Sequence, residues 1–490
     1  MKYGKRIVLF SLFAMNLVDQ PAPEVTIEQG ILSGKISSDG SFFEYLGIPY
    51  ATVNSSTKFK APGPPPTWRG VFKGIDATTK CPQYSELFGV VGIEDCLKIN
   101  VYVPVFVKNP IPVMVYVHGG AFILGDGGKF MYSPDFLLKQ NVIVVVFNYR
   151  LGVLGFLCLG IEGAPGNAGM KDQVAALKWV KKNIANFGGD PDNITVFGES
   201  AGGTSVSLLL LTTATKNLFH RAIVMSGSSL ANWSINRYPS KTASKIAKTL
   251  GFDTQDPVEL FEIFSSMSYK DLIMTTAKIP IAQLLSSKLL HLPCVEKNIP
   301  GVEAFIDDVP YNLLKKNPRN ISVIYGSTDK EGLLFVAKET EESLMLRNQA
   351  NQFSDDLELQ SVVEEKKLNQ KVKEFYFGTE DISTKTITNL SHLYSHLYFF
   401  IPVVLEGELM NKNTESRVYN YYFKYSGGRN LVKRLLGSTN ETGAYHGDDL
   451  GYLFKTMLLP FVPKDDDIKM IKWMTGMFAN FAKYGDPTPP

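Results

Sequence analysis

Short apolar runs alternate with longer amphipathic stretches along most of the chain. Five of these runs are bounded by turn-forming residues and predict buried strands: Val113–Val117, Val142–Phe147, Thr195–Phe197, Ala222–Met225 and Ile321–Tyr325. Between them, Asp172–Ala185 and Ala201–Leu211 show helical patterns. Because strands alternate with helices, the pattern predicts an α/β fold with a mainly parallel central sheet.

Two further regions, Lys241–Leu292 and Glu339–Phe377, have mainly helical patterns, and we expect them to lie over one end of the sheet. No internal repeat and no low-complexity linker divides the chain. Although 490 residues would favour three domains at about 150 residues each, the pattern predicts a single domain, 21–490, with helical insertions.

Charge and composition exclude several functions. The chain has 50 basic and 48 acidic residues, a net charge of +2, and no basic stripe of the kind that binds nucleic acid. Its residues are 44% hydrophobic and 12% aromatic, enough to bury a large core. The composition therefore indicates a globular enzyme or a large binding domain.

The N-terminus has the pattern of a secretory signal peptide. Lys2, Lys5 and Arg6 precede an apolar run over Ile7–Val18, so we assign 1–20 to the signal, without a clear cleavage site. No later segment offers 18 uninterrupted apolar residues, which predicts a mature chain without a membrane span. We expect the protein to be secreted.

Six glycosylation sequons are consistent with export. They begin at Asn54, Asn193, Asn232, Asn320, Asn389 and Asn440. Asn193 leads directly into a predicted strand, so the other five are the candidates for glycosylation.

The four cysteines fit no zinc-binding spacing. In an oxidising compartment, Cys81 and Cys96 are expected to form a disulfide that closes a short loop. Cys158 and Cys294 are expected to be buried free thiols. His392 and His396 have a spacing that suits a metal, but they lack the Glu of H-E-x-x-H and are interpreted as helix packing. We predict no metal and no cofactor.

The strongest local motif is Gly198-Glu-Ser-Ala-Gly202, which follows a predicted strand and opens a predicted helix. In this setting G-x-S-x-G predicts a nucleophile elbow, with Ser200 on a tight turn that projects its hydroxyl clear of the sheet. Small residues on either side let strand and helix approach the turn. The N-terminus of the helix places its backbone amides where an oxyanion would form, and the first of them is the amide of Ala201.

A second motif, His118-Gly-Gly-Ala121, ends the strand at Val113–Val117. Hydrolases with this elbow take further oxyanion donors from such a loop, whose backbone must approach the substrate closely. Gly120 and Ala121 are the candidates for these donors, together with Ala201.

These segments resemble the type-B carboxylesterase and cholinesterase family. The resemblance includes Asp95–Pro104, Gly166–Gln173 and Phe187–Pro191 as well as the Ser200 segment, and it extends from about Gln29 to Gly485. It implies an α/β-hydrolase fold and ester hydrolysis through an acyl-enzyme. The family continues beyond the motif at Tyr484–Pro490, which implies an incomplete C-terminus here.

A serine nucleophile needs a histidine base and an acid, and in α/β-hydrolases both follow the serine along the chain. His446 lies in Ala444-Tyr-His-Gly-Asp-Asp-Leu450, which resembles the family's catalytic-histidine motif. Asp329 and Glu331 both follow the strand at Ile321–Tyr325. The family pattern, with Glu directly before Gly, selects Glu331, and Asp329 is the alternative.

Other polar residues are expected to support this site. Glu199 would lie near the histidine, either tuning its charge or bonding structurally, and family resemblance places the Ser226 hydroxyl near the triad. Arg150 and Asp172 are expected to form a buried ion pair behind the sheet. Asp448 and Asp449 follow His446 too closely to orient it, so we interpret them as structural.

Several function classes remain. We expect a serine carboxylesterase acting on small to medium apolar esters, such as odorant, dietary or xenobiotic esters. A cholinesterase would carry a Trp in the first disulfide loop for the quaternary ammonium, whereas this loop has only Tyr84 and Phe88. A non-catalytic adhesion protein of this fold would have lost triad members. A juvenile hormone esterase stays an alternative, although such enzymes usually carry Gln where this chain has Glu199.

Overall fold

The computed structural model describes residues 21–107, 110–275, 277, 291–316, 318–337, 339–349, 361–436, 442–458 and 463–490. The signal-peptide assignment, 1–20, and the sequon at Asn440 lie outside the described residues.

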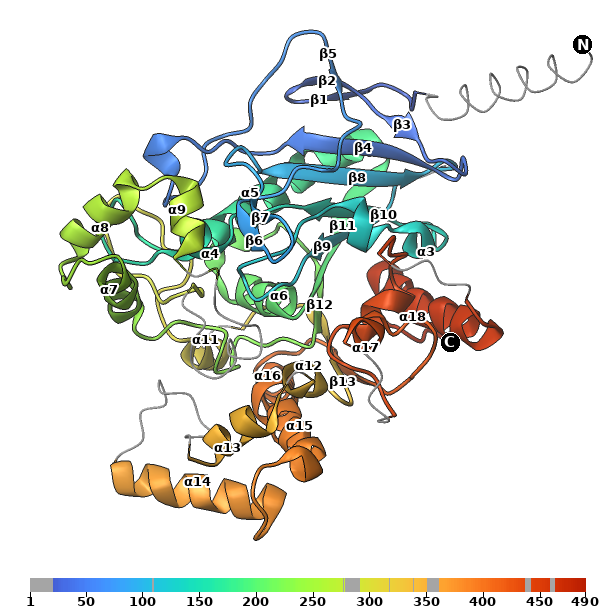
Figure 1. Cartoon of the computed structure of the whole chain (residues 1–490). Coiled ribbons are helices and arrows are strands. Elements are labelled where there is room, and N and C mark those ends of the chain that lie inside the picture. Colours follow the sequence, from blue (N-terminus) through green and yellow to red (C-terminus); the bar gives the residue numbers. More distant parts are fainter. Residues whose placement is uncertain are drawn as a thin grey trace, which may run out of the picture.

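Within the described residues, nine strands form one sheet in the order β14-β13-β12-β11-β9-β10-β8-β4-β3 (Figure 1). Their bounds are β3 Lys35–Ile36, β4 Phe42–Pro49, β8 Lys98–Pro104, β9 Ile111–Val117, β10 Ile143–Phe147, β11 Gly189–Glu199, β12 Arg221–Met225, β13 Ser322–Thr328 and β14 Val418–Phe423. From β10 to β14 neighbouring strands pair in parallel, and β8, β4 and β3 add antiparallel pairs at the other edge. All five predicted strands lie in the parallel part.

Both faces of the central strands β9, β10 and β12 are buried, which explains why these strands are almost continuously apolar. Along β9, Val113, Val115 and Val117 join the core on the face covered by α5 and α6. The alternate residues, Met114 and Tyr116, join the opposite core with α18. The carboxyl ends of the parallel strands therefore meet at one edge, between two helical layers.

The helices cover both faces of the sheet and extend beyond it (Figure 1). Their bounds are α2 Lys129–Tyr132, α3 Asp135–Leu138, α4 Gly152–Phe156, α5 Ala168–Asn183, α6 Ala201–Leu211, α7 Pro239–Thr249, α8 Pro257–Ser266, α9 Tyr269–Met274, α11 Pro310–Lys316, α12 Leu333–Val336, α13 Glu341–Gln349, α14 Val362–Phe377, α15 Ile387–Ser395, α16 Ile401–Asn413, α17 Leu431–Leu435 and α18 Asp465–Tyr484. The smaller strands are β1 Val25–Ile27, β2 Gly30–Ser33, β5 Val71–Lys73, β6 Gln83–Ser85 and β7 Gly89–Val91.

The bounds of α6 match the prediction, but α5 begins four residues earlier than expected. It starts after Asn167, whose backbone is left-handed at φ 56°. The Asn167 side chain exchanges two hydrogen bonds with the backbone of Cys294, from Nδ2 to the carbonyl and from the amide to Oδ1. A contact across 127 residues thus sets the start of the helix, and no local pattern could reveal it.

The two helical insertions are confirmed as helical where they are described. The first contains α7, α8 and α9, which pack with α4 around a separate apolar core at one flank of the sheet. The second contains α13 and α14, which lie beyond α15 and α16 in Figure 1. The expected ion pair between Arg150 and Asp172 is also present and buried, with Nη2 2.6 Å from Oδ1.

The cysteines form two disulfides. Cys81 pairs with Cys96, as expected. The prediction of free thiols at Cys158 and Cys294 is wrong, because these residues form the second disulfide, with Cα atoms 6.7 Å apart. The pair is separated by 136 residues, and only the packing of the α5 entry loop against the segment at 291–296 brings it together. No helix among the described residues is long and apolar enough to cross a membrane.

Candidate active site

Ser200 lies on the sharp turn between β11 and α6. Its backbone has φ 59° and ψ −124°, a strained conformation for a non-glycine residue. A side chain at Gly198 would lie 2.5 Å from the backbone of Gly202, and one at Gly202 would lie 2.1 Å from the Val117 carbonyl. The elbow geometry expected from the motif is therefore present, and both glycines are required by close backbone approach.

The loop after β9 lies directly against this turn. A Cβ on Gly119 would be 2.7 Å from the Glu199 carbonyl and 3.1 Å from the Ser200 Cβ. Gly120 and Ala121 follow with positive φ values of 111° and 54°. Both line the same cavity as Ser200, and Ala201 begins α6 behind it. Gly120, Ala121 and Ala201, the residues expected to donate to the oxyanion, therefore lie next to Ser200 in the sequence or along the same cavity.

Two loops bring Glu331 and His446 together, although 115 residues separate them. The backbone of Lys330 pairs with Tyr445, and the Asp329 carboxylate accepts a hydrogen bond from the Ala444 amide at 2.7 Å. His446 Nδ1 then lies 2.6 Å from Glu331 Oε2. Glu331, and not the alternative Asp329, faces the imidazole, while Asp329 holds the loop that carries it.

The other oxygen of Glu331 is also fixed. Oε1 accepts hydrogen bonds from the Ser226 hydroxyl at 2.6 Å and from the Thr328 amide at 2.8 Å. Ser226 itself has φ 47°, directly after β12. It therefore lies where the resemblance implied, in contact with the acid.

A second carboxylate faces the other imidazole nitrogen. Glu199 Oε1 lies 3.2 Å from His446 Nε2, and both side chains are buried. Burial raises the pKa of Glu199 well above its ordinary value. Burial alone would lower the pKa of His446, but the carboxylates of Glu199 and Glu331 outweigh it and raise the pKa. The imidazole of His446 therefore keeps its proton to a higher pH than an ordinary histidine, because the carboxylates of Glu199 and Glu331 face it.

The cavity that contains Ser200 and His446 has a volume of about 220 Å³. Its walls are largely apolar and include Leu124, Met131, Tyr132, Trp233, Leu334, Phe335, Phe399, Leu431, Val432, Leu450 and Phe454. The described lining includes neither Tyr84 nor Phe88 of the first disulfide loop. Phe88 is 79% exposed instead. This loop therefore supplies no aromatic face for a cationic substrate in the described cavity.

The aromatic wall of this cavity was not predicted from the sequence. Phe399 lies in a π-helical segment, His396–Phe400, between α15 and α16, and its ring centre is 4.6 Å from that of His446. Trp233 packs on Phe399 and donates from Nε1 to the Tyr398 carbonyl. The only signal was an aromatic cluster at 398–400, and a cluster of this kind is more often part of a core.

The other polar residues considered from the sequence, two aspartates and two histidines, make contacts within the fold. Asp448 accepts hydrogen bonds from the Tyr445 and Val432 amides and so joins the His446 loop to α17, while Asp449 accepts from the Tyr421 hydroxyl. The rings of His392 and His396 stack within α15 and the segment after it. Among the described residues, no group of three or more His, Cys, Asp or Glu side chains could hold a metal ion.

The sequons differ in their surroundings. Asn54 and Asn320 are exposed. Asn232 is partly buried, and Asn389 lies within α15 with its amide nitrogen bonded to the Tyr376 carbonyl. Asn193 lies within β11, as the sequence indicated.

Comparison with known proteins gives consistent matches. Residues 21–490 match the model of the carboxylesterase family. The chain is 33% identical to esterase FE4 of Myzus persicae over 95% of this chain and 85% of the relative. It is 32% identical to juvenile hormone esterase of Heliothis virescens over 94% and 85%. The crystal structure of juvenile hormone esterase from Manduca sexta, with OTFP covalently attached, superposes with a TM-score of 0.86 and 28% identity, covering 95% of this chain and 91% of that one.

Proposed function

The chain belongs to the carboxylesterase family, and on that premise we propose that it cleaves carboxylic esters through an acyl-enzyme formed on Ser200. The contact that carries this proposal is the 2.6 Å approach of His446 Nδ1 to Glu331 Oε2, in a cavity that His446 shares with the strained Ser200. A serine hydroxyl is unreactive at neutral pH, and an oriented imidazole is the group that activates it.

In the first half-reaction, Ser200 Oγ bonds to the ester carbonyl carbon while His446 takes the hydroxyl proton. The amides of Gly120, Ala121 and Ala201 donate to the oxygen that gains negative charge. The carbon–oxygen bond to the alcohol then breaks, and His446 returns the proton to the leaving alkoxide. Glu331 keeps the imidazole oriented and stabilises its charged form.

In the second half-reaction, water replaces the alcohol. His446 removes a proton from water as its oxygen bonds to the acyl carbon, and the bond to Ser200 Oγ breaks with return of the proton to the serine. The products are a carboxylic acid and the free enzyme. Every proton is moved by His446, so the cycle needs no cofactor.

The cavity supports small to medium apolar esters as substrates. Its volume of about 220 Å³ is below the roughly 300–1,000 Å³ of typical sites for drug-sized ligands. Its lining is mainly aliphatic and aromatic, which favours acyl and alcohol groups without charge.

A second candidate substrate is juvenile hormone, favoured by the structural match to an esterase of that name. Rates on esters of increasing acyl and alcohol length separate the two. We expect kcat/KM to be highest for short apolar esters and low for juvenile hormone. A maximum on juvenile hormone would make it the substrate.

Labelling with an organophosphate tests the covalent step. One label per molecule should form on Ser200 and abolish ester hydrolysis. Ser200→Ala should take up no label and lose turnover. A label on another residue, or substantial activity in Ser200→Ala, would contradict the proposed mechanism.

We also propose that the protein is extracellular. Its two disulfides are stable in an oxidising compartment and rare in a reducing one. The exposed sequons at Asn54 and Asn320 are the positions where we expect glycans. Peptide mapping of protein secreted from eukaryotic cells, before and after glycosidase treatment, tests both statements. Retention of all of the protein in the cytosol would contradict them.

A further inference from the structure

Glu406 is a buried carboxyl group that the proposed reaction does not use. It lies on α16 and is fully buried, yet none of the ion pairs among the described residues includes it. Burying a carboxylate without a cation is costly unless its oxygens accept several hydrogen bonds. The surroundings of Glu406 therefore need an explanation.

Its partners are neutral donors from three different elements. The Ser207 hydroxyl of α6 and the Tyr325 hydroxyl of β13 donate to Oε1 at 2.5 and 3.0 Å. The amide and hydroxyl of Ser229 donate to Oε2 at 2.9 and 3.2 Å, and the Ser228 hydroxyl donates to the same oxygen. Burial raises the pKa of Glu406, and these hydrogen bonds oppose the rise. The carboxyl group thus ties α6, β13 and the turn after β12 to α16.

Each of these elements leads directly to the candidate active site. α6 begins behind Ser200, and the turn begins at Ser226, which has φ 47° and bonds Glu331. Positive φ is unfavourable for a residue with a side chain, so the turn needs contacts that hold it. α16 follows the π-helical segment that places Phe399 against His446.

We propose that Glu406 is a positioning residue for ester hydrolysis. It holds the turn after β12 through Ser228 and Ser229, and that turn holds Ser226 against Glu331. Glu331 in turn fixes the imidazole of His446. Glu406 contacts no substrate, and its effect reaches the reaction only through this chain of hydrogen bonds. The inference rests on the proposed function, because it assigns a role within that site.

The test is Glu406→Leu, which keeps most of the volume and removes every acceptor. Turnover is measured per Ser200 labelled by an organophosphate, so unfolded molecules do not count. We expect kcat per labelled serine to fall about ten- to a hundredfold, as for small misplacements of catalytic groups. KM should stay within about twofold, because the cavity walls contact substrate as before.

The pH profile separates positioning from general loss of structure. A displaced Glu331 supports the charged imidazole less, so the rise of kcat/KM with pH should move to lower pH in Glu406→Leu. Glu408→Leu is the matched control. It lies two residues further along α16, its side chain is exposed, and both kcat and the profile should be unchanged.

Ser228→Ala is a second variant in case Glu406→Leu does not fold. It removes one hydroxyl donor from Glu406 Oε2 and should lower kcat about threefold, with a smaller shift in the same direction. Wild-type kcat and an unchanged profile in the labelled fraction of either variant would overturn the inference. Absence of label on Ser200 in the wild-type enzyme would instead overturn the proposed function.

Discussion

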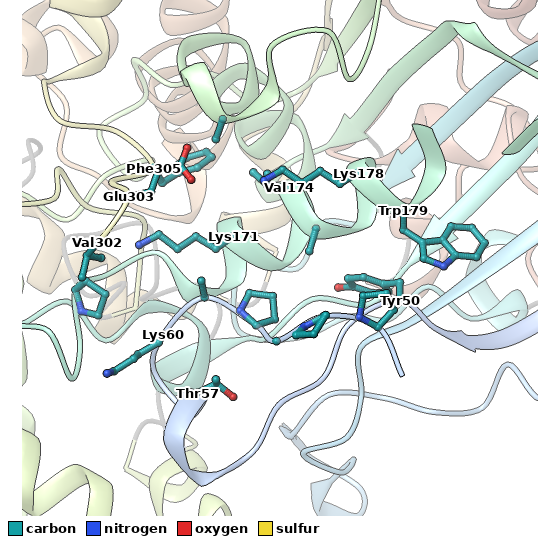
Figure 2. Close-up of a pocket in the computed structure, with 18 of the residues that line it drawn as sticks. Tyr50, Thr57, Lys60, Lys171, Val174, Lys178, Trp179, Val302, Glu303 and Phe305 are labelled. Atoms are coloured by element: carbon teal, nitrogen blue, oxygen red, sulfur yellow. The ribbon is translucent and has the colours of Figure 1, made fainter. Parts of the chain in front are cut away.

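Two of the cavities among the described residues differ in size and in charge, and the one that contains Ser200 is the smaller of the two. A cleft of about 610 Å³ lies beside α5, far larger than the Ser200 cavity of about 220 Å³. Figure 2 shows this cleft, with Lys171, Lys178 and Trp179 of α5 on one side and the loop through Thr57 and Lys60 on the other.

The difference lies in how the charged groups are paired. In the cleft, Lys60 pairs with Glu162 at 3.2 Å, Lys171 pairs with Glu296 at 2.7 Å and Lys182 pairs with Glu28. In the Ser200 cavity, by contrast, the buried carboxylates of Glu199 and Glu331 both face one histidine. A histidine whose pKa is shifted by neighbouring carboxylates is suited to acid–base chemistry. Lysine–glutamate pairs whose charges cancel are more typical of a structural role. Volume alone would therefore not select the cavity that contains Ser200.

The largest effect should come from His446→Ala. Without the imidazole, the group proposed to take the serine proton is lost, and kcat should fall by roughly four to six orders of magnitude. The matched change in the cleft is Lys178→Ala, which should leave kcat unchanged. Initial rates on a short apolar ester, measured with both variants at equal concentrations of folded protein, test the comparison. Near-normal turnover in His446→Ala would assign the base to another residue.

A pair of glycine substitutions compares the two cavities directly. Gly120 and Gly301 both have positive φ, 111° and 79°. A Cβ on Gly120 would lie 2.1 Å from the Leu124 carbonyl, whereas one on Gly301 meets nothing within 4 Å. Gly120→Asp should displace an oxyanion donor and place a negative charge beside the developing oxyanion, which lowers kcat about 100- to 1,000-fold or more.

Gly301→Asp is the control for that substitution, because it adds the same side chain at positive φ on the rim of the cleft. Its kcat should be unchanged. Circular dichroism checks that both variants fold. If a folded Gly120→Asp enzyme had wild-type kcat, the loop after β9 would have no part in the reaction.

A smaller effect is expected in the pH dependence of kcat/KM. His446 is protonated below its pKa, which the neighbouring carboxylates raise, so kcat/KM should increase as the pH rises above the ordinary imidazole range. Glu199→Gln removes one of these carboxylates and lowers the pKa of His446. The rise should therefore move to lower pH by on the order of one unit. Glu303→Gln, in the cleft, should leave the profile in place. An unshifted profile in Glu199→Gln would contradict the coupling.

The parallel strands and the elbow could be predicted because their signals are local. Continuous runs of β-branched and aromatic residues such as Val142–Phe147 have few alternatives to a buried strand. The G-x-S-x-G motif is equally local, because its five residues are contiguous in the sequence. His446 and Glu331 were identified by family resemblance. From chemistry alone, Asp329 and Glu331 were equivalent, since both follow the same strand.

The features that were missed depend on residues far apart in the sequence. The disulfide between Cys158 and Cys294 requires the segment at 291–296 to pack on the entry to α5, and no spacing rule covers 136 residues. Phe399 contacts His446 from a π-helical segment 47 residues before it in the sequence, and no local pattern indicates that contact. In the sequence, Glu406 is one of two glutamates in a helical stretch, and only the fold brings its serine and tyrosine partners to it.

A substitution in the cleft, Lys171→Met, should have the smallest effect on kcat but a clear effect on the free energy of unfolding. Lys171→Met removes the cation from the buried Glu296, whose side chain is 1% exposed and also accepts hydrogen bonds from Asn167 and the Phe305 amide. Breaking such a pair leaves an uncompensated buried charge and should cost about 3 kcal/mol of unfolding free energy. Because Ser200 and His446 do not contact this pair, kcat should be unchanged.

The pH dependence of that loss follows from the direction of the shift in Glu296. Burial raises its pKa in the folded protein, and Lys171 opposes the rise, so Lys171→Met raises the pKa further. A carboxyl whose folded pKa exceeds its unfolded value binds more protons when folded, and stability falls as the pH rises between the two values. The variant should therefore lose more stability at pH 8 than at pH 5, as measured by urea unfolding. An equal loss at both values would assign the effect to packing of the Lys171 side chain, and a large fall in kcat would couple the cleft to the Ser200 cavity.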